Sequence, residues 1–324
     1  MTANVTSPQI VLFIGGLGRS GSTLVEKLLN QLPQAFSVGE TIHLWERGVR
    51  NDELCGCGAR FSQCRHWAEV GQAAFKGWDQ INLDEIINLR WAIDRSRKLP
   101  WIARAHHTGI LSNRQATYVR YLSDVLLASA QVAGNPPVLL ESSKHLSTAA
   151  LLALDPALDV RLLHLIRDSR GVAYSWTKRV PRPETETSGS LDEHDNLMPM
   201  YRTSRTAGRW FTDNLGFEAL ARQVPSLRVR YEDLLADPGL WLTRIGQLVD
   251  IDPQDLDLGF LDGKTATVDA PMHSVAGNPL RFNGSRLTLT TDDAWRKKLT
   301  PTDYRLVTTM TAPMLATYGY QLKA

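Results

Sequence analysis

The first element that the hydrophobic pattern predicts is a buried strand. Residues 9–14 form a short apolar run rich in branched side chains, which is typical of a strand covered on both faces in a parallel sheet. Gly15 and Gly16 end this run. Beyond them, apolar side chains recur at helical spacing as far as Pro33, namely Leu24, Val25, Leu28, Leu29 and Leu32. The pattern therefore predicts a strand, a glycine-rich loop and a helix that starts at Ser22.

The alternation of strand and helix continues along the chain. Further strands, separated by helical patterns, are predicted at residues 35–38, 137–141, 160–166 and 227–231. One of the helices, at residues 239–250, has a buried stripe of Trp241, Ile245, Leu248 and Val249. Such alternation indicates an α/β fold with a P-loop-like central parallel sheet flanked by helices. No repeat and no linker-like shift in composition divides residues 1–324, so we expect a single domain.

One long segment, residues 180–200, lacks a hydrophobic period and is rich in Pro, Glu, Ser and Thr. Loops of this length are uncommon in compact domains and often serve as lids or binding loops. We expect a flexible loop or lid here, with a surface insertion that has no such role as the alternative.

Composition and charge exclude several classes of protein. The 324 residues are 43% hydrophobic and 22% charged, close to globular averages, which excludes disordered and collagen-like chains. The formal net charge is only +2, so nucleic acid is not expected as a partner and any anionic ligand must be held locally. The polar N-terminus and the short apolar run that follows it predict neither a signal peptide nor a membrane span. We therefore expect a soluble, cytoplasmic protein.

The three cysteines lie in one short stretch. Cys55, Cys57 and Cys64 have the spacing C-x-C-x6-C, and their odd number does not resemble an extracellular disulfide framework. His66 is the further ligand that lies nearby in the sequence, which leaves zinc as an alternative. We expect a reduced or locally bridged structural loop without metal.

The glycine-rich loop contains most of a phosphate-binding motif. The stretch Gly16-Leu-Gly-Arg-Ser-Gly-Ser-Thr23 matches the Walker loop G-x-x-x-x-G-K-[ST], except that Ser22 stands where that motif has lysine. Backbone N–H groups of residues 19–23 would still meet at a helix N-terminus, which favours a phosphate. The charge that reaches the β- and γ-phosphates of a nucleoside triphosphate is missing, and Arg19 offers a planar guanidinium instead. We expect one phosphate-like group here, with a glycine turn that binds nothing as the alternative.

A second anion site is predicted where another strand ends. Arg167 follows the strand at residues 160–166, and open α/β sheets place ligand contacts at the carboxyl ends of their strands. Ser175 lies on the predicted helix that follows and adds a neutral donor. Alternatively, Arg167 is a solvated strand end and Ser175 packs against a helix. A nucleoside triphosphate would not require two anion sites at two different strand ends.

These motifs resemble those of a known enzyme family. Residues 18–24, followed by Val38-Gly-Glu40, are similar to the 5′-phosphosulfate loop of sulfotransferases that use 3′-phosphoadenosine 5′-phosphosulfate (PAPS). Residues 165–176 resemble the 3′-phosphate site of the same family. Weaker similarity occurs at residues 141–144, 229–234 and 273–282. The whole set resembles bacterial sulfotransferases related to the tyrosylprotein enzymes.

The resemblance implies a reaction and roles for particular residues. A sulfuryl group would pass from PAPS to an acceptor hydroxyl or phenol, expected to be that of a small molecule, with adenosine 3′,5′-bisphosphate as product and no metal. Glu40 would be the base, with His106 and His107 as the alternative, and Arg19 and Lys144 would stabilise the developing negative charge. The implied PAPS-binding residues are Gly18, Arg19, Ser20, Gly21, Ser22, Thr23, Arg167, Ser175, Tyr231, Gly277, Asn278 and Arg281.

Two competing functions remain open at this point. A P-loop kinase or nucleotide hydrolase would use the same strand, loop and helix, but it would require the lysine that Ser22 replaces. A non-catalytic protein that binds the nucleotide without turnover would give Glu40, Arg19 and Lys144 no common purpose.

Overall fold

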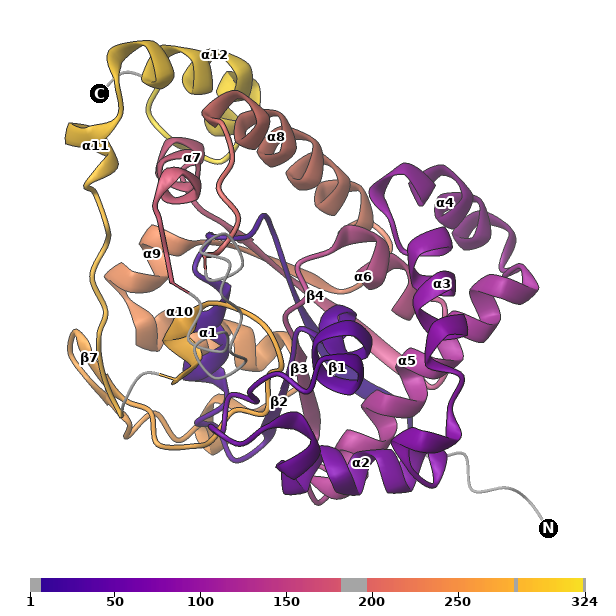
Figure 1. The fold of residues 1–324 in the computed structure, drawn as a ribbon. Helices are drawn as coiled ribbons and strands as arrows, with labels where there is room; N and C mark the ends of the chain where they lie inside the picture. The colour runs from indigo at the N-terminus through magenta and orange to yellow at the C-terminus, as the bar shows by residue number, and fades with distance from the viewer. Residues whose placement is uncertain (1–6, 182–196, 283–284, 323–324) are drawn as a thin grey trace.

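Five strands form the centre of the fold, in the order β2-β3-β1-β4-β5, and every neighbouring pair is parallel. They are β1 (Gln9–Gly15), β2 (Ala35–Gly39), β3 (Val138–Glu141), β4 (Leu158–Ile166) and β5 (Ser226–Arg230) (Figure 1). All five lie where the hydrophobic runs predict strands. The predicted α/β fold with a central parallel sheet is therefore confirmed.

The structure, a computed structural model, describes residues 7–181, 197–282 and 285–322. Most of the predicted loop or lid at residues 180–200 therefore lies outside the described residues. At the two edges of that segment, the backbone N–H of Met198 donates to the carbonyl of Val180 at 2.8 Å, and Pro181 pairs with Leu197.

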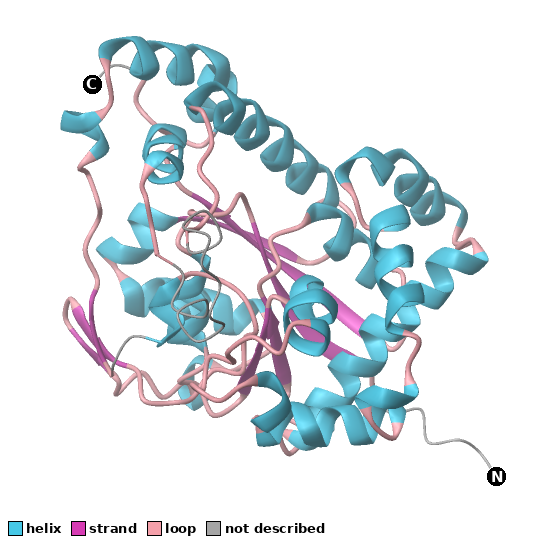
Figure 2. Ribbon diagram, in the orientation of Figure 1, coloured by secondary structure: helices cyan, strands magenta, loops and turns pink. Residues whose placement is uncertain are grey.

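The central strand β1 is buried on both faces, as its continuous apolar run predicts. Val11 and Phe13 pack into one core with α2 (Arg65–Phe75) and α5 (Asn113–Val132). Leu12 and Ile14 pack into a second core on the opposite face. The helices of that face are α1 (Ser22–Leu29), α9 (Tyr231–Ala236) and α10 (Pro238–Leu248). Figure 2 shows the sheet between these helical layers.

Helix α1 ends earlier than its apolar period predicts. Its last residue is Leu29, because the next side chain, Asn30, makes hydrogen bonds outside the helix. Asn30 Oδ1 accepts from the backbone N–H of Ser37 at 2.8 Å, and Asn30 Nδ2 donates to the carbonyl of Pro271 at 3.1 Å. Leu32 still lies in the core, but in a turn.

Apart from α7, which is the helix predicted after Arg167, the elements that remain were not predicted individually from the sequence. The remaining helices are α3 (Leu83–Ile93), α4 (Leu99–Thr108), α6 (Leu146–Leu152), α7 (Ser169–Thr177), α8 (Thr203–Leu220), α11 (Trp295–Lys298) and α12 (Pro301–Thr317). A small antiparallel sheet contains β6 (Leu261–Asp262), β7 (Thr265–Thr267) and β8 (Arg286–Thr288). Across the described ranges, no helix is both long enough and apolar enough to span a membrane.

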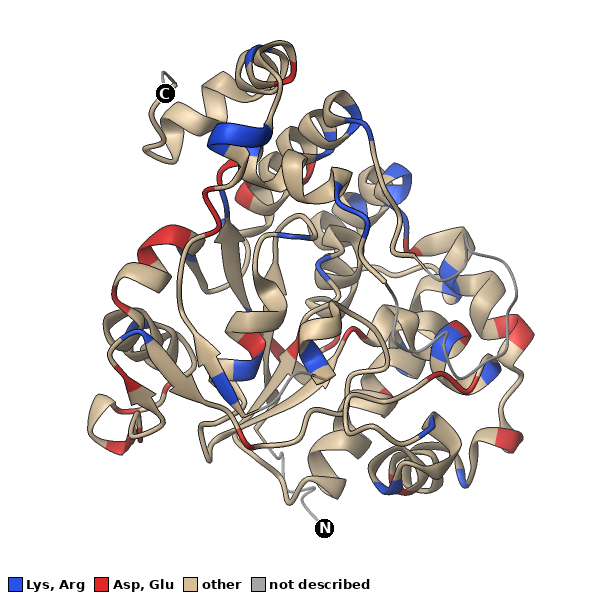
Figure 3. Ribbon diagram, turned by 60° about the vertical axis from the view of Figure 1, so that its left-hand side comes forward, with Lys and Arg blue, Asp and Glu red and all other residues tan. Residues whose placement is uncertain are grey.

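The topology brings four strand ends to one edge of the sheet. Because β1 to β4 are parallel, the residues that follow them lie at the same edge. These are the glycine-rich loop after β1, Glu40 after β2, residues 142–144 after β3 and Arg167 after β4. Figure 3 shows positions of both charge signs spread over the fold.

Candidate active site

A cavity of about 510 Å³ opens at this edge of the sheet. The predicted site residues line it, except for Ser20 and Arg281. Ser20 is buried within the loop, and Arg281 lines a separate hollow beside Lys27 and Cys57. The two predicted anion sites and the predicted catalytic residues thus share one cavity.

The glycine-rich loop has a backbone that only glycine tolerates at its key position. Gly21 precedes α1 with a φ of 95°, and a Cβ there would lie 2.2 Å from the ring of Tyr231. No side chain caps the N-terminus of α1, so its first N–H groups are available to a ligand. Tyr231, the first residue of α9, closes this side of the loop, and burial raises the pKa of its phenol.

Arg167 connects the second predicted anion site to the loop. Its Nη1 donates to the carbonyl of Arg19 at 3.2 Å, and its guanidinium carbon lies 5.2 Å from the centre of the Tyr231 ring. Ser175 lines the cavity from α7. On the same helix, Trp176 Nε1 donates to the carbonyl of Gly18 at 2.9 Å. The end of β4 and the last turn of α7 are therefore fixed against the loop after β1.

Arg19 has a partly unsatisfied guanidinium. Its Nη2 contacts Met198 Sδ at 3.3 Å, and its guanidinium carbon lies 5.2 Å from the centre of the Trp176 ring. Arg19 Nε is buried and has no hydrogen-bond partner among the described residues. Burial also lowers the pKa of Arg19. A buried, unpartnered donor in a cavity is the arrangement expected where an anionic oxygen binds.

Glu40 and Lys144 form an ion pair in the cavity. Lys144 Nζ donates to Glu40 Oε1 and, at 2.7 Å, to the carbonyl of Ser142. His43 Nε2 lies 3.6 Å from the other carboxylate oxygen of Glu40. Lys144 has a φ of 63°, an uncommon conformation for a residue other than glycine, which indicates that the surrounding contacts hold it in place.

A buried carboxylate, Glu141, accepts hydrogen bonds from the residues next to this pair in the sequence. It accepts from the backbone N–H of Thr41 at 3.1 Å, from Thr41 Oγ1 at 2.7 Å and from the backbone N–H of Ser143 at 3.0 Å. Thr41 follows Glu40 and Ser143 precedes Lys144, so one side chain fixes the backbone of both. Burial raises the pKa of Glu141.

Several cavity residues were not found by sequence reasoning. In addition to the predicted residues, the cavity is lined by His43, Arg47, His145, Arg209 and Asp213. Burial, with the nearby charges of His43 and Arg90, lowers the pKa of His145 to about 3. His43 and Arg47 lie on the helical turns just after Glu40, and this proximity is the signal that could have found them. Arg209 and Asp213 come from α8 and carry no local motif.

The alternative bases, His106 and His107, lie elsewhere. Both are on α4, where His106 Nε2 contacts the carbonyl of Ala150 at 2.7 Å, and neither lines the cavity. The histidines that the fold places near Glu40 are instead His43 and His145.

Comparisons with known proteins identify the family of this chain. A model of the sulfotransferase family matches residues 12–255, more than half of the chain. The chain belongs to the sulfotransferase family. It is therefore a transferase, and the resemblance of its motifs to those of sulfotransferases is confirmed.

Individual relatives of this sulfotransferase are distant. Carbohydrate sulfotransferase 7 of Rattus norvegicus is 25% identical over 195 residues, which cover 54% of this chain and 40% of that protein. Carbohydrate sulfotransferase 6 of Homo sapiens is 26% identical over 337 residues, covering 94% of this chain and 78% of that protein. The structure of the sulfotransferase domain from the Synechococcus PCC 7002 olefin synthase is 19% identical, covers 99% of this chain and 98% of that chain, and superimposes with a TM-score of 0.50, which supports the fold.

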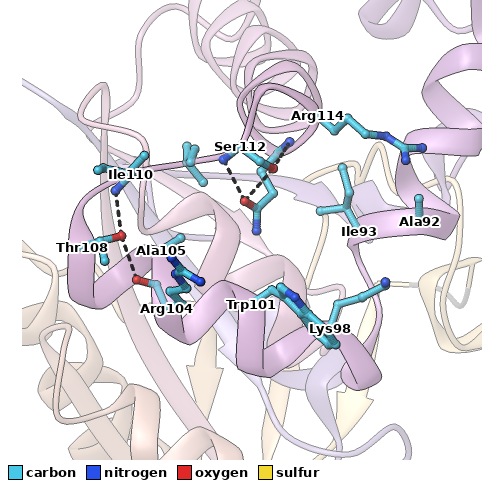
Figure 4. Close-up of a pocket in the computed structure, with 12 residues that line it drawn as sticks. Ala92, Ile93, Lys98, Trp101, Arg104, Ala105, Thr108, Ile110, Ser112 and Arg114 are labelled. Carbon is cyan, nitrogen blue, oxygen red and sulfur yellow. Dashed lines mark hydrogen bonds between the residues drawn. The ribbon is translucent and has the colours of Figure 1, made fainter.

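A second hollow of about 430 Å³ lies between α4 and the start of α5 in this sulfotransferase (Figure 4). None of the predicted site residues lines it. Two hydrogen bonds join residues of its lining: Ser112 Oγ donates to Gln115 Oε1 at 2.8 Å, and Thr108 Oγ1 donates to the carbonyl of Arg104 at 2.9 Å. The site residues predicted from the sequence thus gather in the cavity at the sheet edge and not in this hollow.

A buried carboxyl beneath the cavity predicts a pH-dependent stability. Glu26 accepts hydrogen bonds from Ser37 Oγ at 2.5 Å and from Ser142 Oγ at 2.7 Å, and burial raises its pKa from 4.5 to about 7. Between these values the folded chain keeps a proton that the unfolded chain releases, so stability falls as the pH rises. The expected loss between about pH 4.5 and pH 7 is on the order of 3 kcal/mol, and stability then levels off with respect to this group.

Chemical denaturation of the wild type and Glu26→Gln at about pH 5 and pH 8 measures this effect. The introduced amide carries no titrating proton, so the variant should gain stability relative to the wild type at the higher pH. The matched control is Glu69→Gln, which removes a partly exposed carboxylate paired with Arg65. A difference between Glu26→Gln and the wild type that does not change with pH would contradict the prediction.

Proposed function

We propose that this sulfotransferase transfers the sulfuryl group of PAPS to a hydroxyl of a small acceptor by in-line displacement. The observation that carries the proposal is the shared cavity. It is lined by the phosphate loop, by Arg167 and Ser175, and by the pair of Glu40 and Lys144.

The donor would occupy the part of the cavity near the loop. The uncapped N-terminus of α1 and the buried Nε of Arg19 suit the 5′-phosphosulfate, because both present unsatisfied donors. Arg167 and Ser175 suit the 3′-phosphate, and Tyr231, which lines the same cavity, would contact the adenosine. Gly277 has a φ of 118°, and with Asn278 it lines the cavity. Because glycine has no side chain, the backbone here would approach the bound donor closely.

The chemistry would proceed between the donor and Glu40. Glu40 takes the proton of the acceptor hydroxyl while the acceptor oxygen forms a bond to sulfur. The bond between sulfur and the bridging oxygen breaks, and adenosine 3′,5′-bisphosphate leaves with the electron pair. Lys144 and Arg19 stabilise the negative charge that develops on this oxygen. The scheme requires no metal.

The acceptor would enter beside Glu40. His43, Arg47 and Arg209 line the same cavity, where Arg47 pairs with Glu53 at 2.6 Å. Such a polar lining suits an acceptor with several hydrogen-bonding groups. The names of the two carbohydrate sulfotransferases support an alcohol hydroxyl as the acceptor group. Labelled PAPS incubated with the enzyme and a native metabolite extract would identify the acceptor.

Thermal shift tests the donor site directly. Adenosine 3′,5′-bisphosphate at a hundredfold excess over its Kd should stabilise the wild type by about 2.7 kcal/mol. ATP with magnesium should give a much smaller shift, because the loop lacks the Walker lysine. Arg167→Ala should reduce the shift with the bisphosphate but not that with adenosine 5′-monophosphate, which lacks the 3′-phosphate.

Each contrary result has a distinct meaning. A larger shift with magnesium ATP would favour a kinase or a hydrolase. Equal weakening of both adenosine ligands in Arg167→Ala would make Arg167 a structural residue. Binding of the bisphosphate without transfer to any acceptor would favour a non-catalytic nucleotide-binding protein.

A further inference from the structure

The fold brings all three cysteines together with a histidine from a distant part of the chain. Cys57 Sγ lies 3.7 Å from Cys64 Sγ. His273 Nδ1 lies 3.3 Å from Cys64 Sγ and 3.8 Å from Cys55 Sγ. All four ligand atoms lie within 4.8 Å of one another. We propose that these residues bind a structural Zn²⁺ ion in a tetrahedral site of three cysteines and one histidine.

The separations match the edges of a zinc tetrahedron. Zinc–sulfur bonds of about 2.3 Å and zinc–nitrogen bonds of about 2.0–2.1 Å place two sulfurs about 3.8 Å apart, and sulfur and nitrogen about 3.5 Å apart. The separations between Cys57 and Cys64 and between His273 and its two neighbours lie close to these values. A disulfide needs about 2.05 Å and would use only two of the four groups. Four protein ligands also fill the tetrahedron, which is the property of structural rather than catalytic zinc sites.

The two segments that carry the ligands are held together by contacts that do not involve the thiols. The backbone N–H of Gly56 donates to the carbonyl of Ser274 at 2.8 Å, and Trp67 Nε1 donates to the carbonyl of His273 at 2.8 Å. A tight turn orients the first two cysteines, because the backbone N–H of Gly58 donates to the carbonyl of Cys55 at 2.9 Å. The ligand positions are thus fixed before a metal arrives, which favours binding.

The histidine that the sequence places nearest is not the ligand. The ring of His66 stacks on that of His273, with 4.7 Å between their centres, and the ring of Phe36 stacks on that of His273 at 6.0 Å. These rings fix the orientation of the His273 imidazole. Cys55 and Cys64 are buried, whereas Cys57 is exposed and leaves a path for the ion.

The ion would connect this cluster to one wall of the cavity. His273 is followed by Ser274, whose hydroxyl packs so closely on Gly39 that a Cβ there would lie 2.3 Å away. Three residues later, Gly277 packs beside Glu40, with 3.0 Å between Glu40 Oε1 and the position of a Cβ on that glycine. Zinc would therefore stabilise residues 273–278 against the end of β2. This consequence for the cavity rests on the proposed function, whereas the binding of zinc does not.

Metal analysis of the purified wild-type protein tests the proposal. Inductively coupled plasma mass spectrometry should find stoichiometric zinc, and X-ray absorption at the zinc edge should show three sulfur ligands and one nitrogen ligand. Cobalt substitution should give the visible absorption of tetrahedral cobalt thiolate. Metal-free protein after expression in zinc-supplemented medium, or a disulfide between Cys57 and Cys64 in native mass spectrometry, would overturn the proposal.

Variants identify the zinc ligands. Neither the metal analysis nor the variant tests require PAPS or a sulfuryl acceptor. Cys57→Ser and His273→Ala should lose the zinc, whereas His66→Phe, which keeps an aromatic ring in the stack, should retain it. If the ligand variants do not fold, chelation of the wild-type protein still tests zinc binding. A strong chelator should lower the thermal midpoint of the wild type and expose three thiols to alkylation. A chelator without either effect would overturn the proposal. Because catalysis is not measured, zinc binding and sulfuryl transfer can fail independently.

Discussion

Glu40→Gln should lower turnover by about 10²- to 10⁴-fold, the range typical for loss of a general base. The glutamine keeps the shape of the side chain, and its amide oxygen can still accept the hydrogen bond from Lys144 Nζ that Glu40 accepts in the wild type. It cannot take the proton of the acceptor. Steady-state kinetics with labelled PAPS would measure the loss, and the affinity for adenosine 3′,5′-bisphosphate should stay nearly unchanged.

An acidic phenol separates proton transfer from other roles of Glu40. If 4-nitrophenol is an acceptor, it ionises with less help, so its rate should fall by less than that of an alcohol. The matched control is Glu46→Gln, on the helical turns that follow Glu40. Its carboxylate pairs with Arg90 at 2.7 Å, much as Glu40 pairs with Lys144, but it does not line the cavity. Wild-type turnover in Glu40→Gln would remove Glu40 as the base, and His43 and His145 would be the next positions to change.

The parts of the site that the sequence predicts are those with local spacing. The loop after β1 and the pair of Arg167 and Ser175 are each encoded within one strand, one turn and one helix, so their geometry follows from nearby residues. Parallel strands then bring the two motifs to one edge without further information. Glu40 and Lys144 required the family resemblance, because a single acid or base at a strand end carries no chemical signature of its own.

Two of the cavity residues that were missed come from a distant segment. Arg209 and Asp213 reach the cavity from α8, and only the packing of that helix places them there. The cysteine stretch shows the same limit in a sharper form. Its spacing suggests His66 as the nearest ligand. In the structure, however, the histidine that contacts Cys64 is His273, which lies 209 positions later in the sequence. The short strands β6 to β8 are missed because two or three residues do not make a period.

Lys144→Ala should lower kcat by about 10²- to 10³-fold, the cost typical of removing one group that stabilises charge in a transition state. The ammonium lies in the cavity at the end of β3, where it can meet negative charge on the leaving oxygen. That charge is largest in the transition state, so the affinity for adenosine 3′,5′-bisphosphate should fall much less than kcat. Lys144→Arg should recover only part of the rate, because a planar guanidinium cannot replace a compact ammonium at the same point.

The removal of Lys144 also leaves the buried Glu40 without its cation, so the experiment must separate this effect from lost charge stabilisation. The double variant Glu40→Gln, Lys144→Ala does so, because it contains no unpaired carboxylate. If Lys144 acts on the leaving oxygen, the double variant should be slower than Glu40→Gln alone. Equal rates for these two variants would mean that Lys144 acts only through Glu40.

Lys178→Ala, which breaks a partly exposed pair with Asp292 outside the cavity, is the matched control and should leave kcat unchanged. Weaker binding of the bisphosphate with normal kcat in Lys144→Ala would instead assign Lys144 to donor binding.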